Sequence, residues 1–196
     1  MTSPRNAAVP APAEAVAAPD AIVPDTKDWT WVLERPCTDC GLDTPAVARE
    51  DVAGMVRANA EAWQAVLAGD EEGLRHRPAP GTWSDLEYAC HVRDVFRLFH
   101  VRLGLMLDQE GPLFPNWNQD ATAVAERYQE QRPKDVAVDL AAAAQVLADA
   151  FEQVEGEQWQ RTGRRSDGAR FTVESFARYL IHDPVHHLYD VTGAGA

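Results

Sequence analysis

The stretch His182-Asp183-Pro184-Val185-His186-His187, near the C-terminus, holds three of the six histidines of the chain. His182 and His186 are four residues apart, so on a helix both imidazoles lie on one face, about 6 Å from each other. Two ligands rarely make a metal site, and the best candidate for a third is His91, in a separate helical pattern. We therefore predict a site formed by His91, His182 and His186. Three protein ligands leave one coordination position open, as catalysis at a metal requires.

The composition predicts one globular domain with an additional tail. The chain has 196 residues, of which 45% are hydrophobic and 25% charged, as in ordinary globular proteins. Its formal net charge is −13, which argues against nucleic acid and anionic membranes as partners because both bind basic surfaces. There is no apolar run of the roughly 20 residues that a membrane span needs, and no signal-peptide pattern. Three cysteines do not make a disulfide framework, and the expected location is the cytoplasm.

The part of the chain before the helices falls into two segments. Residues 1–27 are rich in Ala and Pro and lack periodicity, which predicts a disordered tail. In residues 28–44, Trp29, Trp31 and Leu33 alternate, which predicts an extended segment laid across the helices. The same segment contains Cys37-x-x-Cys40, the spacing of half a zinc ribbon or of a redox pair. We interpret it as a tight turn with reduced thiols; a second metal site and a disulfide switch are the alternatives.

Residues 45–190 carry four amphipathic patterns with a 3.6-residue period. The predicted helices run from about Thr44 to Ala68, from Ser84 to Met106 or Leu107, from near Pro133 to near Val154, and from about Thr172 to Asp190. The second begins with the capping box Ser84-x-x-Glu87, and Pro184 should kink the fourth. Long connections join them, which predicts an all-α four-helix bundle.

Two of these connections have marked compositions. Residues 108–133 contain large apolar side chains that we expect to pack over one end of the bundle, followed by a short helix at about 120–131. Residues 155–171 contain four arginines within ten residues, which we interpret as a solvated loop; an anion site is the alternative.

Neutral imidazoles would leave the full charge on a divalent ion, which lowers the pKa of a bound water or thiol. Asp94, together with Asp183 or Asp190, is a candidate for orienting the ligating rings.

The order of these motifs resembles that of the DinB/YfiT-like superfamily of four-helix-bundle metalloproteins. The resemblance rests on Trp83-Ser84-x-x-Glu87-x-x-x-His91 at the start of the second helix and on His182-x-x-x-His186 in the last, and it covers roughly residues 45–190. It implies that His91, His182 and His186 hold a divalent ion, zinc or nickel in the first place. Two features depart from the family pattern: Pro184 lies between two ligands, and His187 adds a competing imidazole.

The resemblance also implies a chemistry. Where the activity of members is understood, it is often that of a low-molecular-weight thiol S-transferase or a mycothiol-dependent isomerase. It implies a small-molecule substrate and a cosubstrate thiol, held by the metal as a thiolate that attacks an electrophile. One alternative is a metal-dependent hydrolase, with water in the open coordination position of the metal. The other is a non-enzymatic stress or binding protein in which the ion only holds two helices together. A homodimer is compatible with such a bundle, although no apolar surface stripe establishes one.

Overall fold

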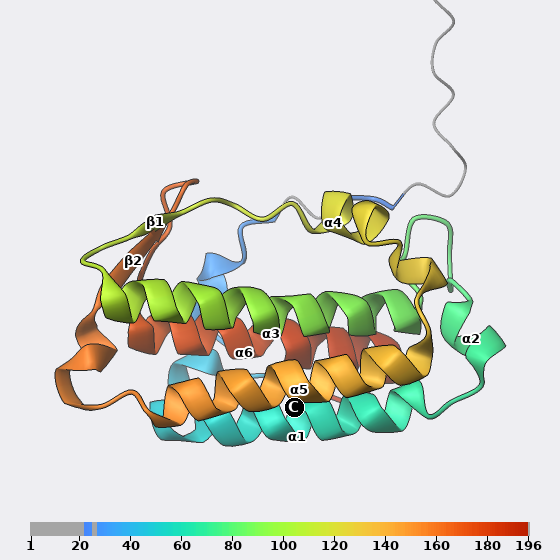
Figure 1. Cartoon of the computed structure of the whole chain (residues 1–196), viewed down its shortest axis with the longest axis horizontal. Coiled ribbons are helices and arrows are strands. Elements are labelled where there is room, and N and C mark those ends of the chain that lie inside the picture. Colours follow the sequence, from blue (N-terminus) through green and yellow to red (C-terminus); the bar gives the residue numbers. More distant parts are fainter. Residues whose placement is uncertain (1–21, 25–26, 196) are drawn as a thin grey trace, which may run out of the picture.

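Four long helices form the scaffold: α1 (Val52–Leu67), α3 (Asp85–Asp108), α5 (Pro133–Glu152) and α6 (Val173–Thr192). They belong to a computed structural model that describes residues 22–24 and 27–195. Helices α1 and α3 each pack along both α5 and α6 (Figure 1). Helices α1 and α3 therefore occupy opposite corners of the bundle, as do α5 and α6, whereas the consecutive helices α3 and α5 are neighbours. The predicted four-helix bundle is confirmed, whereas the predicted tail, residues 1–27, lies outside the described residues except for 22–24 and 27.

Local capping explains where the long helices begin and end. The Ser84 side chain accepts from the backbone N–H of Glu87, whose carboxylate accepts from the N–H of Ser84 in return, and the predicted capping box of α3 is present. Thr172 and Ser175 form the corresponding box of α6, and Gly193 ends that helix with a φ of 69°. Pro133 occupies the first turn of α5, where its missing N–H costs nothing.

The first helix starts later than predicted. It was expected to start at about Thr44, but the hydroxyl of that residue donates to the carbonyl oxygen of Val32. The chain forms two short 3-10 turns, η2 (Thr44–Ala46) and η3 (Arg49–Asp51), before α1 begins at Val52.

The core lies between the four helices and includes one polar side chain that links two of them. Large apolar residues are fully buried there, among them Trp63, Phe96, Leu140 and Leu180. Asn59, on the apolar stripe of α1, is also buried, and its Nδ2 donates to the carbonyl oxygen of Pro184 at 2.8 Å. Helix α6 continues through Pro184. This hydrogen bond therefore joins α1 to α6 within the histidine-rich stretch.

The long connections contain strands that the sequence did not predict. β1 (Leu113–Phe114) pairs in parallel with β2 (Thr162–Arg165), which pairs antiparallel with β3 (Arg170–Thr172). A Cβ at Gly163 would lie 2.8 Å from a side-chain carbon of Met106 and 2.9 Å from one of Phe114, so the sheet can approach the bundle end only with glycine here. Strands this short show no readable alternation of polar and apolar residues, which is why the second connection was predicted as a loop.

The other connecting elements are short helical segments. They are α2 (Glu71–Arg75), α4 (Gln119–Ala125), and the 3-10 helices η4 (Tyr128–Glu130) and η5 (Gly156–Gln160). Phe114 and Tyr128 are buried, so the connection between α3 and α5 does pack on the bundle. None of the helices in residues 22–24 and 27–195 is long and apolar enough to cross a membrane.

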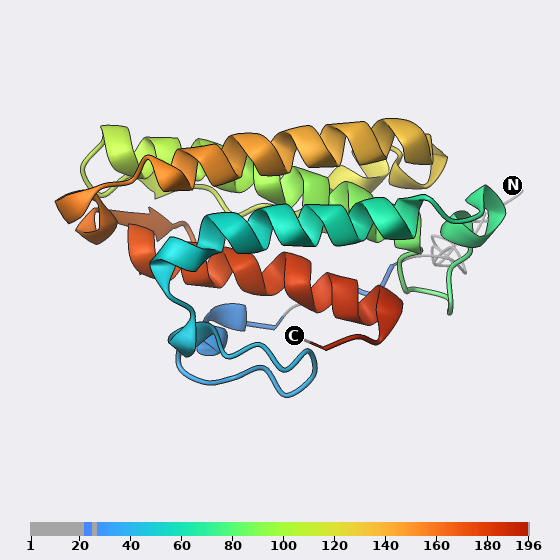
Figure 2. The ribbon, with the colours of Figure 1, turned by 90° about the horizontal axis from the view of Figure 1, so that it is seen from below.

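The segment before α1 lies along α6. Figure 2 shows the blue and cyan part of the chain beside the red helix, on the side of α6 away from α5. The segment contains a 3-10 helix, η1 (Trp29–Leu33), so the predicted extended conformation is wrong there. The Asp28 carboxylate accepts from the backbone N–H and the hydroxyl of Thr30, which starts a turn at this point. Within the segment, Val32, Cys37 and Cys40 are buried.

Candidate metal centre

Two groups of metal-binding side chains meet on adjacent faces of α6. One, which we call the aspartate cluster, consists of His91, Asp183 and His187. The other, the cysteine cluster, consists of Cys37, Cys40, His182 and His186. In each group, one ligand atom per residue lies within 4.8 Å of those of all the other members.

The three predicted ligands are therefore divided between two clusters. Among the described residues, His91 forms no such group with His182 and His186 and meets Asp183 and His187 instead. Neighbouring residues of a helix point about 100° apart, so a shift of one residue selects a different face of α6. The binding of metal by His91, His182 and His186 stays a prediction, but the structure does not place them in a single site.

The aspartate cluster is centred on a carboxylate between two imidazoles. Oδ1 of Asp183 lies 3.3 Å from Nε2 of His91 and 3.9 Å from Nε2 of His187. His91 is fully buried, and its ring stacks on Trp117 with 5.2 Å between centroids and 7° between planes. Its Nδ1 is buried and has no hydrogen-bond partner among the described residues. Trp83 packs on the same ring, with centroids 5.1 Å apart.

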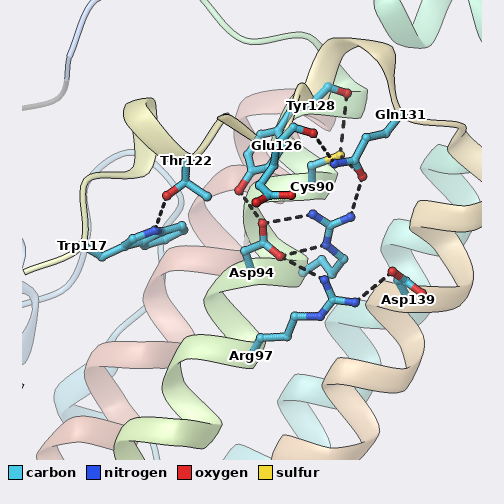
Figure 3. Close-up of polar contacts among 10 residues, drawn as sticks. Cys90, Asp94, Arg97, Trp117, Thr122, Glu126, Tyr128, Gln131 and Asp139 are labelled. Atoms are coloured by element: carbon cyan, nitrogen blue, oxygen red, sulfur yellow. Dashed lines mark hydrogen bonds and ion pairs between the residues drawn. The ribbon is translucent and has the colours of Figure 1, made fainter. Parts of the chain in front are cut away.

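Helix α3 and the following connection hold His91 and Trp117 in place. Asp94, one turn after His91, accepts hydrogen bonds from Nε of Arg93 and from the hydroxyl of Tyr128 (Figure 3). Trp117 in turn donates to the Thr122 hydroxyl at 2.7 Å. Asp94 was a candidate for orienting a ligating ring, but these contacts give it a different role. It fastens the connection, and with it the aromatic cover of His91, to α3.

Asp190, another of the predicted ring-orienting residues, does contact a histidine of the cluster. Its Oδ2 accepts from Nδ1 of His187 at 3.0 Å, so the proton of that imidazole is on Nδ1 and Nε2 is turned toward Asp183. Hydrogen bonding of this kind fixes the tautomer and the direction of a metal-binding histidine.

The electrostatics of the aspartate cluster favour a cation. Burial lowers the pKa of His91, which keeps the imidazole neutral as a ligand must be. Burial raises the pKa of Asp183, but the neighbouring His91 and His187 more than offset this and hold that pKa below its usual range. Two imidazoles and one carboxylate form a donor set that fits a divalent ion.

The aspartate cluster borders a cleft of 1210 Å³. Asp183 and His187 line it together with His182 and His186. The cleft walls also carry aromatic and basic side chains, namely Trp29, Trp83, Tyr88, Trp117, Tyr179, Arg102 and Arg165. A small molecule in this cleft would therefore reach the side chains of Asp183 and His187.

Two arginines place positive charge in the cleft wall. Arg102 is 5% exposed, and within residues 22–24 and 27–195 its Nε has no hydrogen-bond partner. Burial and the nearby Arg165 lower the pKa of Arg102 to about 10. Arg165 donates to the Tyr179 hydroxyl at 3.0 Å. Arg165 belongs to the arginine-rich connection that was interpreted as a solvated loop, so this residue departs from that interpretation.

Sequence reasoning considered His187 only as a competing imidazole and Asp183 only as a residue that orients a ligating ring, and it did not pair the two as ligands. The signal was present, because Asp183-x-x-x-His187 has the same spacing as His182-x-x-x-His186. Only the rotation of α6 in the bundle decides which pair faces His91.

Comparisons with known proteins agree with this architecture. The family model of the DinB superfamily matches residues 55–191. The solved structure of YfiT from Bacillus subtilis, described as a probable metal-dependent hydrolase with an unusual four-helix bundle topology, is similar, with a TM-score of 0.68. The two sequences are 17% identical, and the match covers 76% of this chain and 87% of that chain. At this identity the likeness shows the fold alone. No curated protein sequence matches this chain.

Proposed function

Because the chain belongs to the DinB superfamily, we propose that it is a divalent-metal-dependent enzyme in which the aspartate cluster holds the ion. The observation that carries the proposal is the position of the Asp183 carboxylate, with imidazole nitrogens of His91 and His187 at 3.3 Å and 3.9 Å. Three protein ligands leave a coordination position for a substrate. Imidazole and carboxylate donors suit zinc and nickel, the ions that we expect.

The residues around the cluster have separate roles in this proposal. A divalent ion bound there would lower the pKa of a thiol or water that joins it. Asp190 holds the proton of His187 on Nδ1 and so directs Nε2 toward the cluster. Trp117 and Trp83 cover the ring of His91 and exclude water from it. Asp183 supplies one negative charge, which reduces the charge of a bound divalent ion by one.

We propose that the reaction is the transfer of a low-molecular-weight thiol to a small electrophile. The size of the cleft supports two substrates, because 1210 Å³ exceeds the roughly 300–1,000 Å³ typical of a site for one small ligand. Arg102 in the cleft wall suits a substrate that carries a carboxylate or another anionic group, whereas Arg165 already forms an ion pair with Asp167.

A metal-dependent hydrolase is the second candidate, and the ligand set favours it. Two histidines and one carboxylate are also the protein ligands of zinc peptidases, which activate water. YfiT, whose fold this chain shares, is described as a probable metal-dependent hydrolase.

The deciding experiment compares the two reactions on one protein. Protein purified without an affinity tag is loaded with zinc or nickel and incubated with an electrophile, with and without mycothiol, and with ester and amide substrates in the absence of thiol. We expect product only when the thiol is present. Hydrolysis without thiol would establish the second candidate, and the absence of both reactions would overturn the proposal of an enzyme.

A matched pair of variants tests the site. His91→Ala removes a member of the aspartate cluster, whereas His100→Ala removes a histidine from the same helix outside both clusters. We expect the first variant to lose the reaction and one equivalent of metal and the second to retain both.

A further inference from the structure

The cysteine cluster joins two parts of the chain that are far apart in sequence. Sγ of Cys37 lies 3.6 Å from Nδ1 of His186, across a separation of 149 residues. The rings of His182 and His186 have centroids 5.0 Å apart. Cys37, Cys40 and His182 are 2%, 0% and 3% exposed, and the His186 side chain is 12% exposed. Four donor groups therefore converge at a largely buried position, where the two histidines also border the cleft.

The local structure of each pair suits a shared ion. The turn that holds the cysteines is closed by two backbone hydrogen bonds, from Gly41 to the carbonyl of Cys37 at 3.0 Å and from Cys37 to the carbonyl of Leu42 at 2.9 Å. Gly41 has a φ of 81°, which glycine adopts without strain. The histidines are four apart on α6 and share one face. Cys-x2-Cys from a turn and His-x3-His from a helix is the ligand spacing of Cys2His2 zinc sites.

One buried nitrogen of the cluster lacks a partner. Nε2 of His182 has no hydrogen bond to any part of the chain that the structure describes. A buried polar atom without a partner costs free energy, so native proteins rarely leave one. Trp29 covers this region, with ring centroids 5.3 Å from His182 and 5.0 Å from His186.

We propose that Cys37, Cys40, His182 and His186 bind one zinc ion in a closed, structural site, separate from the aspartate cluster. Four protein ligands leave no position for a substrate, which distinguishes this site from a catalytic one. Two thiolates neutralise the charge of a divalent ion, which suits a buried position, and thiolate with imidazole donors selects zinc. The ion fastens residues 28–44 to α6 and thereby places Trp29 in the wall of the cleft.

Burial and the backbone shift the pKa of Cys40 in opposite directions. Burial raises the pKa of Cys40 to about 11, while the backbone N–H of Leu42 directed at the sulfur lowers it. The turn thus already supplies one donor that stabilises the thiolate, and a bound cation would supply the rest.

Cobalt binding tests the proposal directly. Full-length protein, purified without an affinity tag and reduced with a phosphine, is titrated with Co²⁺, whose tetrahedral thiolate complexes have a near-ultraviolet charge-transfer band and visible d–d bands. We expect both bands to reach their maximum when one Co²⁺ ion is bound to the thiolates of each chain. Both should disappear when one equivalent of zinc is added. Reduced, folded protein that shows no thiolate band with Co²⁺ would overturn the proposal.

Variants locate the site and separate it from the proposed enzyme centre. Cys37→Ser and Cys40→Ser should lose the thiolate band and one equivalent of zinc, whereas Cys90→Ala, which removes a buried cysteine outside the cluster, should keep both. His91→Ala should keep the thiolate band while losing activity, so failure of one site is distinguishable from failure of the other.

Two further outcomes decide against the site. A thiolate band that persists in Cys37→Ser would overturn it. So would a Cys37–Cys40 disulfide found by mass spectrometry in zinc-free protein purified without oxygen. If the serine variants do not fold, the cobalt spectrum of the wild-type protein decides alone.

Discussion

The two clusters on α6 differ in contact with solvent although they use neighbouring residues of one helix. Asp183 and His187 in the aspartate cluster have side chains that are 34% and 18% exposed, and they line the cleft. Cys37 and Cys40 in the cysteine cluster are almost completely buried. His182 and His186 also line the cleft, so the second cluster differs from the first in its two buried sulfurs, which would hold an ion on the side away from the cleft. A difference of one residue in helix position thus separates a candidate reaction centre from a candidate structural site.

The largest expected effect is on activity and involves the aspartate cluster alone. Asp183→Ala removes the carboxylate between the two imidazoles, and we expect turnover to fall by about 100-fold or more, because a catalytic metal supplies several kcal/mol of transition-state stabilisation. Steady-state assays on the metal-loaded protein measure this loss. Asp135→Ala, in the first turn of α5, is the control and should retain activity. An Asp183→Ala protein with full activity would remove the cluster from the mechanism.

The next effect is on stability and involves the cysteine cluster. Removing zinc with a chelator should lower the free energy of unfolding by roughly 2–3 kcal/mol, as expected for a ligand present at about 100 times its Kd. Hydrogen exchange should rise first in residues 28–44, which the ion fastens to α6. Denaturant unfolding with and without chelator measures the change. Equal loss of protection along all four helices would show that the ion does not act as a local fastener.

A smaller effect should come from Asp190, a carboxylate that approaches both clusters. It lies 3.0 Å from Nδ1 of His187 but 3.8 Å from Nε2 of His186. Asp190→Asn should therefore weaken metal binding at the aspartate cluster by about 10-fold, within the range for residues that orient ligands, and affect the cysteine cluster less. Competition with a metal indicator measures both affinities, with Asp139→Asn on α5 as the control. A larger loss at the cysteine cluster would reverse the assignment of Asp190.

Much of the bundle was predictable because its signals are local. The capping box at Ser84, the proline at the start of α5 and the 3.6-residue stripes placed three of the four long helices to within a few residues. The first helix was placed too early because the Thr44 hydroxyl bonds to Val32, a contact made only in the folded chain. The strands were not predicted because segments of two to four residues are too short to show an alternation of polar and apolar side chains.

The grouping of the ligands was not predictable in the same way. Both candidate pairs on α6 have the four-residue spacing, and nothing local distinguishes them. The rotation of α6 is set by packing, including the Asn59 hydrogen bond to Pro184 and the burial of His182 under Trp29. The partners of Cys37 and Cys40 lie at the other end of the chain. A motif that is half a site in the sequence therefore becomes a complete donor set only in the fold.

The smallest expected effect is on the stability of the protein at low pH. It involves Glu87 on α3 and not the cysteine cluster. Glu87, one turn before His91, is buried and forms an ion pair with Arg77. Burial raises the pKa of Glu87, but hydrogen bonds from Arg77 and from the backbone N–H of Ser84 outweigh burial and hold it below the usual 4.5. A carboxyl with a depressed pKa stabilises the fold above its unfolded pKa, and this contribution is lost as the pH falls.

Glu87→Gln should therefore destabilise the protein at pH 7, and the difference from wild type should shrink as the pH is lowered toward 4. Unfolding by denaturant at both pH values, on zinc-free protein so that ligand protonation does not contribute, measures this difference. Glu61→Gln, on the exposed face of α1, is the control and should show no such convergence. A gap between Glu87→Gln and wild type that stays constant from pH 7 to pH 4 would contradict the assignment. The stability that Glu87 provides would then come from packing at the start of α3 and not from its charge.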